Sequence, residues 1–338
     1  MRADRFPGSA HALRILLIVV VAAGVALFTL PSPAKAYSNN GVPVIYVHGF
    51  NSNAAVPGGC NGSTNFGSIR DYLTKNGWTG PMYSVKYYNG DTSCDADLHA
   101  LEGYHCTGWF AGHEGTTNED LRHLSCLLAW YIWDHFTSSG VAVKLIGHSM
   151  GGILIRQTLA DTPYVGAFPP YITVEDVATA GSPHQGMISA AAFFYCGSCS
   201  QVAQIEQANG FMQWLNSTTI RGGFGRDPQG NTGTDWTTMS SFDDEVLAWC
   251  ASVIDSFNGY ISSHSNTIEC GFMPGATHLV AYIGPTPDYN HGGYLTDEAT
   301  TWDADMSFSD SNGQYWSTSV SMPHSIKTMM YAISYTSW

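Results

Sequence analysis

Ser149 stands between glycines in the segment Gly147-His-Ser-Met-Gly-Gly152, and its surroundings suit a nucleophile. An apolar run at 141–146 precedes this segment and is typical of a buried strand, whereas 153–160 is typical of a helix. The pattern G-x-S-x-G between a strand and a helix predicts a nucleophile elbow, a tight turn that presents the serine hydroxyl above a sheet. The first amides of the helix would then point at a reacting carbonyl. Ser149 is therefore the predicted nucleophile of an acyl-transfer reaction.

A second glycine turn, His48-Gly49-Phe50, ends an apolar run at 42–47 that is typical of a strand buried on both faces. Acyl-transfer sites of this kind need two backbone donors for the developing oxyanion, one after the nucleophile and one from a neighbouring strand–helix loop. We expect the backbone N–H groups of Phe50 and Met150 to form this oxyanion hole. The chemistry requires neither a metal ion nor an organic cofactor.

The elements that would position these residues alternate between strands and helices. Strand-like runs lie at 42–48, 82–88, 141–146, 172–180 and 279–283, and the run at 279–283 would be the last strand of the sheet. The pattern Thr116-x-x-Glu119 is typical of a capping box and predicts the start of a long amphipathic helix. A C-terminal helix is expected at 323–333. This alternation predicts an α/β fold with a mostly parallel central sheet and helices on both faces, with the site at the carboxyl ends of the strands.

Three motifs together resemble a known family. The segments Pro43–Phe50, Gly147–Gly152 and Gly181-Ser-Pro-His-Gln-Gly186 are similar to those of the secreted bacterial lipases and esterases of the α/β-hydrolase fold. The resemblance extends from Pro43 to about residue 300. It implies a Ser-His-Asp triad in which the acid and then the histidine follow Ser149 along the chain.

The acid of the triad is expected in the turn after the next strand, where the chain reads Ser-Phe-Asp243-Asp244-Glu-Val246. In the family, an apolar β-branched residue commonly follows the acid three positions later. Asp243 with Val246 matches this spacing, and Asp244 does not. The resemblance therefore implies that Asp243 is the acid.

The catalytic base is expected among the histidines that follow Asp243. His291 lies in the segment His-Gly-Gly-Tyr-Leu-Thr-Asp297, which is similar to the family's histidine loop. His278 would begin the last strand, and His324 would lie in the C-terminal helix. His264 is expected to face solvent. We place His291 first as the base and keep His278 and His324 as alternatives.

The expected activity is that of a carboxylic-ester hydrolase acting on apolar acyl esters through an acyl-enzyme, including esters at a lipid interface. An extracellular acyltransferase would use the same triad and remains open. A non-catalytic binding module on a hydrolase scaffold is a third alternative, against which the intact motifs argue.

The N-terminus predicts the compartment. Basic residues precede an apolar run at 15–30, and Ala34-Lys-Ala36 is typical of a cleavage site, so residues 1–36 are expected to be a secretory signal peptide rather than a membrane anchor. Residues 37–338 would then form a single catalytic domain, secreted and monomeric. That part carries 9 basic and 26 acidic residues, a formal charge of −17. Such a charge disfavours nucleic acid as a partner.

All eight cysteines follow the predicted signal peptide, and in an oxidising compartment an even number predicts disulfides. Short loops favour the pairs 60–94, 106–126, 196–199 and 250–270. Four histidines lie among these cysteines: His99, His105, His113 and His123. Their spacing fits no tetrahedral zinc motif, so we expect a dispersed surface set and no metal site.

Overall fold

The computed structural model describes residues 41–101, 105–106, 113–162, 164–188, 196–216, 234–241, 244–247, 270–273, 276–282, 289–296, 301–309 and 315–334. The predicted signal peptide lies outside these ranges. Asp243, Cys250 and His264 lie outside them as well.

In the described part of the chain, nine strands form one sheet in the order β3-β2-β1-β4-β5-β6-β7-β8-β9. The first seven in this order pair in parallel: β3 (Ala96–Asp97), β2 (Met82–Lys86), β1 (Val44–Val47), β4 (Val143–His148), β5 (Val174–Ala180), β6 (Asp235–Ser241) and β7 (His278–Tyr282). The prediction that this last run ends the sheet is wrong, because β8 (Thr301–Ser309) and β9 (Tyr315–Pro323) extend it as an antiparallel pair. The mostly parallel sheet is confirmed.

Three longer helices lie between the parallel strands in the chain, α2 (Phe66–Lys75), α3 (Leu121–His135) and α4 (Met150–Asp161), and a fourth, α9 (Ser325–Ser334), follows β9. Shorter turns of helix are α6 (Ser200–Gln204), α7 (Gly210–Leu215), η1 (Leu98–Leu101), η3 (Thr137–Ser139) and η5 (Gly293–Leu295). The predicted capping box is wrong. The N-cap of α3 is Asp120, whose carboxylate accepts the N–H of Arg122 at 2.7 Å. Glu119 does not cap the helix because its carboxylate binds two histidines and the N–H of Gly115.

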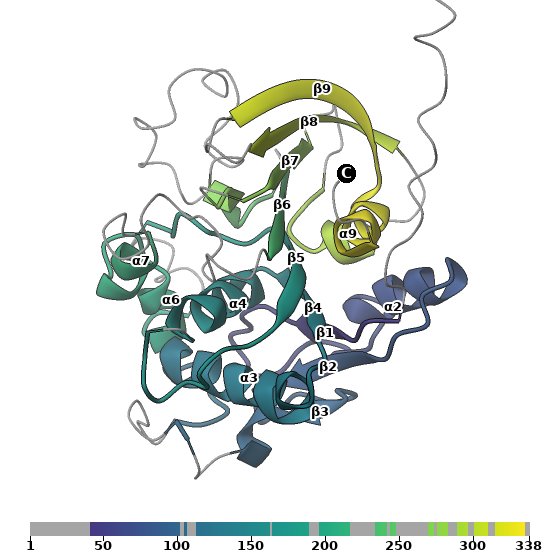
Figure 1. Ribbon diagram of the computed structural model, residues 1–338. Coiled ribbons are helices and arrows are strands. Elements are labelled where there is room, and N and C mark those ends of the chain that lie inside the picture. The colour runs from purple at the N-terminus through teal and green to yellow at the C-terminus, as the bar shows by residue number, and fades with distance from the viewer. Residues whose placement is uncertain are drawn as a thin grey trace, which may run out of the picture. The chain divides into compact units, whose positions relative to one another are not determined.

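Each face of the sheet packs against its own group of helices, as Figure 1 shows. Successive residues of β1 point to opposite faces, as strand geometry requires. Ile45 and Val47 pack in one core with residues of α3 and α4, whereas Val44 and Tyr46 pack in a second core with residues of α2 and α9. Both faces are therefore buried, and the central strand β4 leads directly into Ser149 and α4. Together these features are those of the α/β-hydrolase fold.

Three of the predicted disulfides are confirmed: Cys60–Cys94, Cys106–Cys126 and Cys196–Cys199. The fourth pair was predicted between Cys250 and Cys270, and Cys250 is outside the described ranges. Within the residues that the structure describes, no helix combines the length and the hydrophobicity needed to cross a bilayer.

Candidate active site

The turn between β4 and α4 places Ser149 at the carboxyl end of the central strand β4. Ser149 has φ 55° and ψ −132°, a backbone conformation that non-glycine residues rarely adopt and that costs about 1–3 kcal/mol. A Cβ atom on Gly151 would collide with the carbonyl oxygen of Val47, so α4 can approach β1 this closely only with glycine at that position. These features are the strained turn expected of a nucleophile elbow.

His291 lies against Ser149, although 141 residues separate them in the sequence. Its Nε2 atom is 2.8 Å from the Ser149 hydroxyl oxygen. The side chain of His291 is 15% exposed, and Ser149 is 9% exposed. A nucleophile and a base at this distance, both open to a pocket, can pass a proton when the hydroxyl attacks a carbonyl carbon.

The carboxylate on the other side of His291 belongs to Asp244. Its two oxygens lie 3.0 and 3.1 Å from Nδ1 of His291, and its side chain is fully buried. One of these oxygens also accepts the backbone N–H groups of Val246 and Leu247, each at 3.0 Å. Our sequence prediction assigned this role to Asp243, which lies outside the described residues. Asp244, which does not match the family's spacing to an apolar residue, is the residue that contacts His291.

Gly181 packs closely against both Asp244 and His291. It follows β5 and has φ +58°, and a Cβ atom there would lie 3.0 Å from a carboxylate oxygen of Asp244 and 3.2 Å from Nδ1 of His291. In the sequence, Gly181 was visible only as the first residue of a motif. The structure shows that a side chain at this position would press on the pair that holds the proton.

The backbone of His291 is held at both ends. His148 donates from Nε2 to the carbonyl oxygen of His291 at 2.7 Å, and the N–H of His291 donates to the Glu245 carboxylate at 3.0 Å. Burial and, to a lesser extent, the nearby His291 lower the pKa of His148 to about 3. His148 is therefore neutral and adds no charge next to the base. No sequence pattern indicated this contact.

An apolar pocket of about 130 Å³ opens at Ser149 and His291. Its other lining residues are Phe50, Met150, Pro183, Met187, Val202, Ile205 and Val246. The two expected oxyanion donors therefore belong to residues that line the pocket. Met150 is the first residue of α4, where backbone N–H groups have no partner within the helix.

The alternative histidines lie elsewhere. His278 begins β7, at the opposite end of the strands from Ser149, with Nδ1 3.6 Å from an Asp235 oxygen. His324 precedes α9 and packs edge-on against Tyr72, with ring centroids 5.1 Å apart. Neither is among the residues that contact Ser149 or line its pocket.

The expectation that the histidines near the cysteines form a dispersed surface set is wrong for His99 and His123. Both bind the buried Glu119 carboxylate, His99 at 2.9 Å and His123 at 2.8 Å, and the His123 side chain is only 4% exposed. Burial, the largest influence, raises the pKa of Glu119, but the two histidines and the N–H of Gly115 outweigh it, and the pKa is lowered. Glu119 is thus a charged anchor between η1 and α3.

No family model matches this chain, and no curated protein matches it in sequence. Among solved structures, the mature Bacillus licheniformis lipase BlEst2 is similar at 18% identity and TM-score 0.43, over 79% of this chain and 89% of that protein. Aspergillus fumigatus lipase B is similar at 16% identity and TM-score 0.43, over 79% of this chain and 52% of the lipase. The Listeria innocua lin2722 gene product is similar at 14% identity and TM-score 0.41, over 87% of this chain and 94% of that one. Likeness at this level does not bear on what this chain binds or does.

Proposed function

We propose that this chain is a secreted serine hydrolase that cleaves carboxylic esters through an acyl-enzyme. The observation that carries the proposal is the relay of Ser149, His291 and Asp244, with 2.8 Å between nucleophile and base and 3.0 Å between base and acid. The relay begins at a strained turn between a central strand and a helix, at the mouth of an apolar pocket. This arrangement has the geometry of a Ser-His-Asp triad, in which each group has a distinct role.

In the proposed reaction, the Ser149 hydroxyl attacks the ester carbonyl carbon while Nε2 of His291 takes its proton. Asp244 accepts the hydrogen bond from Nδ1–H, which keeps Nε2 free as a base and stabilises the imidazolium that forms. The N–H groups of Phe50 and Met150 stabilise the negative charge on the tetrahedral oxygen. The leaving alcohol departs with the proton of His291, and water then repeats the sequence on the acyl-enzyme.

The pocket favours esters with a short apolar acyl chain. Its volume of about 130 Å³ is close to that of the roughly 150 Å³ apolar cavity that binds benzene, so it suits an acyl group of about six carbons. The lining residues are nearly all apolar, and they supply no charged partner for a polar acyl group. We therefore propose short-chain alkyl esters as the substrate class.

Secretion is part of the proposal. Stable disulfides are typical of oxidising compartments, and three are present in the described residues. The predicted signal peptide at 1–36 supports the same compartment. Expression of the full chain followed by N-terminal sequencing of the exported product would test the cleavage site, expected before Tyr37.

The decisive experiment compares wild type and Ser149→Ala on p-nitrophenyl esters from acetate to palmitate. We expect kcat/KM to be highest for acyl chains of about four to six carbons and Ser149→Ala to lose on the order of 10³-fold or more. A p-nitrophenyl phosphonate probe should release p-nitrophenol, add the mass of its phosphonyl group to wild type at Ser149, and leave the variant unlabelled. Substantial turnover by correctly folded Ser149→Ala would overturn the proposal.

A further inference from the structure

The peptide that joins Gly49 to Phe50 is held by two side chains. Its carbonyl oxygen accepts hydrogen bonds from Nδ1 of His48 and from the hydroxyl of Tyr87, each at 2.9 Å. The same hydroxyl also donates to the carbonyl oxygen of His48 at 2.6 Å, so its one proton is shared between the two neighbouring carbonyls. In a planar trans peptide the C=O and N–H groups point in opposite directions. Whatever fixes the Gly49 carbonyl therefore also fixes the direction of the Phe50 N–H.

This peptide lies directly against the nucleophile. A Cβ atom on Gly49 would be 2.5 Å from the Cβ of Ser149, and Phe50 lines the pocket beside Ser149. At such a distance, a small rotation of the peptide would move the Phe50 N–H away from the oxyanion. Misplacement by about 1 Å can cost on the order of 10²-fold in rate.

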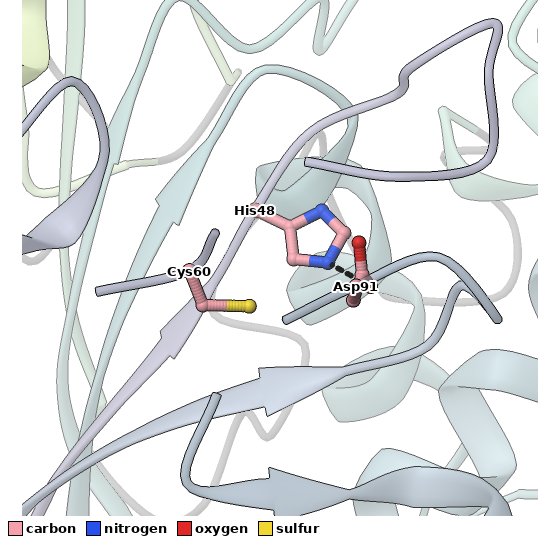
Figure 2. A group of neighbouring side chains, drawn as sticks. All are labelled: His48, Cys60 and Asp91. Atoms are coloured by element: carbon pink, nitrogen blue, oxygen red, sulfur yellow. Dashed lines mark hydrogen bonds and ion pairs between the residues drawn. The ribbon is translucent and has the colours of Figure 1, made fainter. Parts of the chain in front are cut away.

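The His48 ring is held from its other side by Asp91, as Figure 2 shows. Nε2 of His48 is 2.9 Å from the carboxylate, and the ring stacks on Tyr87 with centroids 4.0 Å apart. Both ring nitrogens thus face acceptors, the Asp91 carboxylate and the Gly49 carbonyl. An imidazole can donate from both nitrogens only when it is protonated. The geometry is therefore that of an imidazolium paired with a carboxylate.

Asp91 has enough hydrogen-bond donors to remain charged although its side chain is fully buried. Its oxygens also accept the backbone N–H groups of Val56, Tyr87 and Tyr88, at 2.9, 3.2 and 2.8 Å. Burial, the largest influence, raises the pKa of Asp91, but His48 and the backbone donors outweigh it, and the pKa is lowered. A buried carboxylate with this many donors anchors the histidine in one orientation.

A metal site would be another use of these side chains. His48, Asp91 and Cys60 offer ligand atoms within 4.8 Å of one another. Figure 2 shows these three side chains as neighbours. Cys60 is bonded to Cys94 in a disulfide, however, and so cannot supply the thiolate that a metal would require. The ion pair is therefore the arrangement that the chemistry of these residues supports.

We propose that His48, held as an imidazolium by Asp91, acts together with Tyr87 as a positioning residue of the oxyanion hole. Their two hydrogen bonds to the Gly49 carbonyl direct the Phe50 N–H toward the oxyanion above Ser149. Burial raises the pKa of the Tyr87 hydroxyl well above its ordinary value, so this group stays a donor. The inference rests on the proposed ester hydrolysis and assigns a role to residues behind its site.

Two amide substitutions separate the two bonds of His48. In His48→Gln the side-chain amide can reach the place of Nε2 and donate to Asp91, but the bond to the Gly49 carbonyl is lost. In His48→Asn the amide takes the place of Nδ1 and can donate to that carbonyl, but Asp91 loses a partner. We expect His48→Gln to lower kcat by about 10- to 100-fold with KM within about threefold. His48→Asn should retain a higher kcat than His48→Gln and have the lower melting temperature.

Tyr87→Phe removes the other donor to the Gly49 carbonyl, and we expect a loss in kcat of about 10-fold at similar KM. His123→Gln is the matched control. Like His48→Gln, it removes a hydrogen bond made by Nδ1 of a buried histidine, here the 2.8 Å bond from His123 to Glu119, and His123 does not line the pocket. The control should lower the melting temperature and leave kcat unchanged.

All variants are assayed as the full secreted chain with a short p-nitrophenyl ester, and their melting temperatures are measured in parallel. A wild-type kcat for His48→Gln would overturn the inference, as would a kcat for His48→Asn below that of His48→Gln. If His48→Gln does not fold, a wild-type kcat for Tyr87→Phe overturns it. Failure of the proposed function looks different, because wild type itself would then fail to hydrolyse the ester.

Discussion

The acid of the triad offers the sharpest test of the site, through Asp244→Asn. Asp244 accepts Nδ1–H of His291 and two backbone N–H groups, from Val246 and Leu247. In the variant, the amide oxygen would stay with the backbone donors, because an amide nitrogen cannot accept from them. The amide N–H₂ would then take the place of the oxygen 3.1 Å from Nδ1 of His291, where it opposes an N–H group on that nitrogen and favours the tautomer with the proton on Nε2.

The expected magnitude follows from this change of tautomer. With a proton on Nε2, His291 can no longer take the proton of Ser149, 2.8 Å away. A wrong tautomer in a triad of this geometry costs on the order of 10⁴-fold in kcat, about 5.5 kcal/mol of transition-state stabilisation. The fold should change little, since the variant keeps the shape of the side chain. We therefore expect a loss of about 10⁴-fold in kcat for a short p-nitrophenyl ester, with an unchanged circular dichroism spectrum.

The control is Asp243→Asn, because Asp243 is the residue that the sequence pattern favoured. It removes the same charge one position away, and we expect its kcat to stay within about threefold of wild type. If Asp243→Asn loses activity and Asp244→Asn does not, the observed contact with His291 is not the catalytic one. A similar loss in both variants would point to the net charge of the loop instead, which also contradicts the assignment.

Three further predictions concern the pocket, the turn beside the acid and the opposite end of the sheet. Ile205→Ala should raise the ratio of kcat/KM for octanoate to that for butyrate esters, because Ile205 lines the pocket; an unchanged ratio would contradict the acyl-binding role. Gly181→Ala should lower kcat by about 10- to 100-fold and cost about 1 kcal/mol in unfolding free energy, since φ is +58° and a Cβ would press on Asp244 and His291; wild-type kinetics would refute this. Burial, partly offset by Lys144, raises the pKa of Asp176 to about 6. The folded state therefore holds a proton that the unfolded chain releases near pH 4, and stability from this group falls as pH rises from 4 to 6. The melting temperature of Asp176→Asn relative to wild type should rise over that interval, and a constant difference would disprove it.

The parallel part of the fold could be predicted because its signals are local. The apolar runs before His48 and Ser149 are strands buried on both faces, and such strands contain little else than apolar residues. The antiparallel pair β8–β9 was missed although its sequence alternates, as in Trp302-Asp-Ala-Asp-Met-Ser-Phe308. Alternation with period two is typical of strands, but here the polar residues broke the apolar runs that had indicated the other strands.

Ser149 and His291 could be picked out of the sequence because each lies in a motif that resembles one of the family's, and at Ser149 the close approach of α4 to β1 requires glycine at 151. The choice between Asp243 and Asp244 could not be made in this way. Adjacent residues of a loop point their side chains in different directions, and a one-residue shift in how the loop leaves β6 exchanges them. Only the position of His291, 47 residues further on, determines which carboxylate meets Nδ1. Spacing to the next apolar residue carries no information about that distant contact.

The residues behind the site were the hardest to infer, for a related reason. Asp91 and Tyr87 lie outside the motifs, and His148 occupies a variable position of the G-x-S-x-G motif. Each acts by holding a backbone group of a motif residue: Asp91 through His48, Tyr87 on Gly49 and His148 on His291. Every residue has a backbone carbonyl, so a hydrogen bond to it does not depend on the residue type. The sequence of a motif therefore does not indicate which side chain binds its backbone. The motifs of this chain therefore identify the groups that would react, whereas the groups that orient them follow only from how β1, β2 and β4 and the loops after them pack around the elbow.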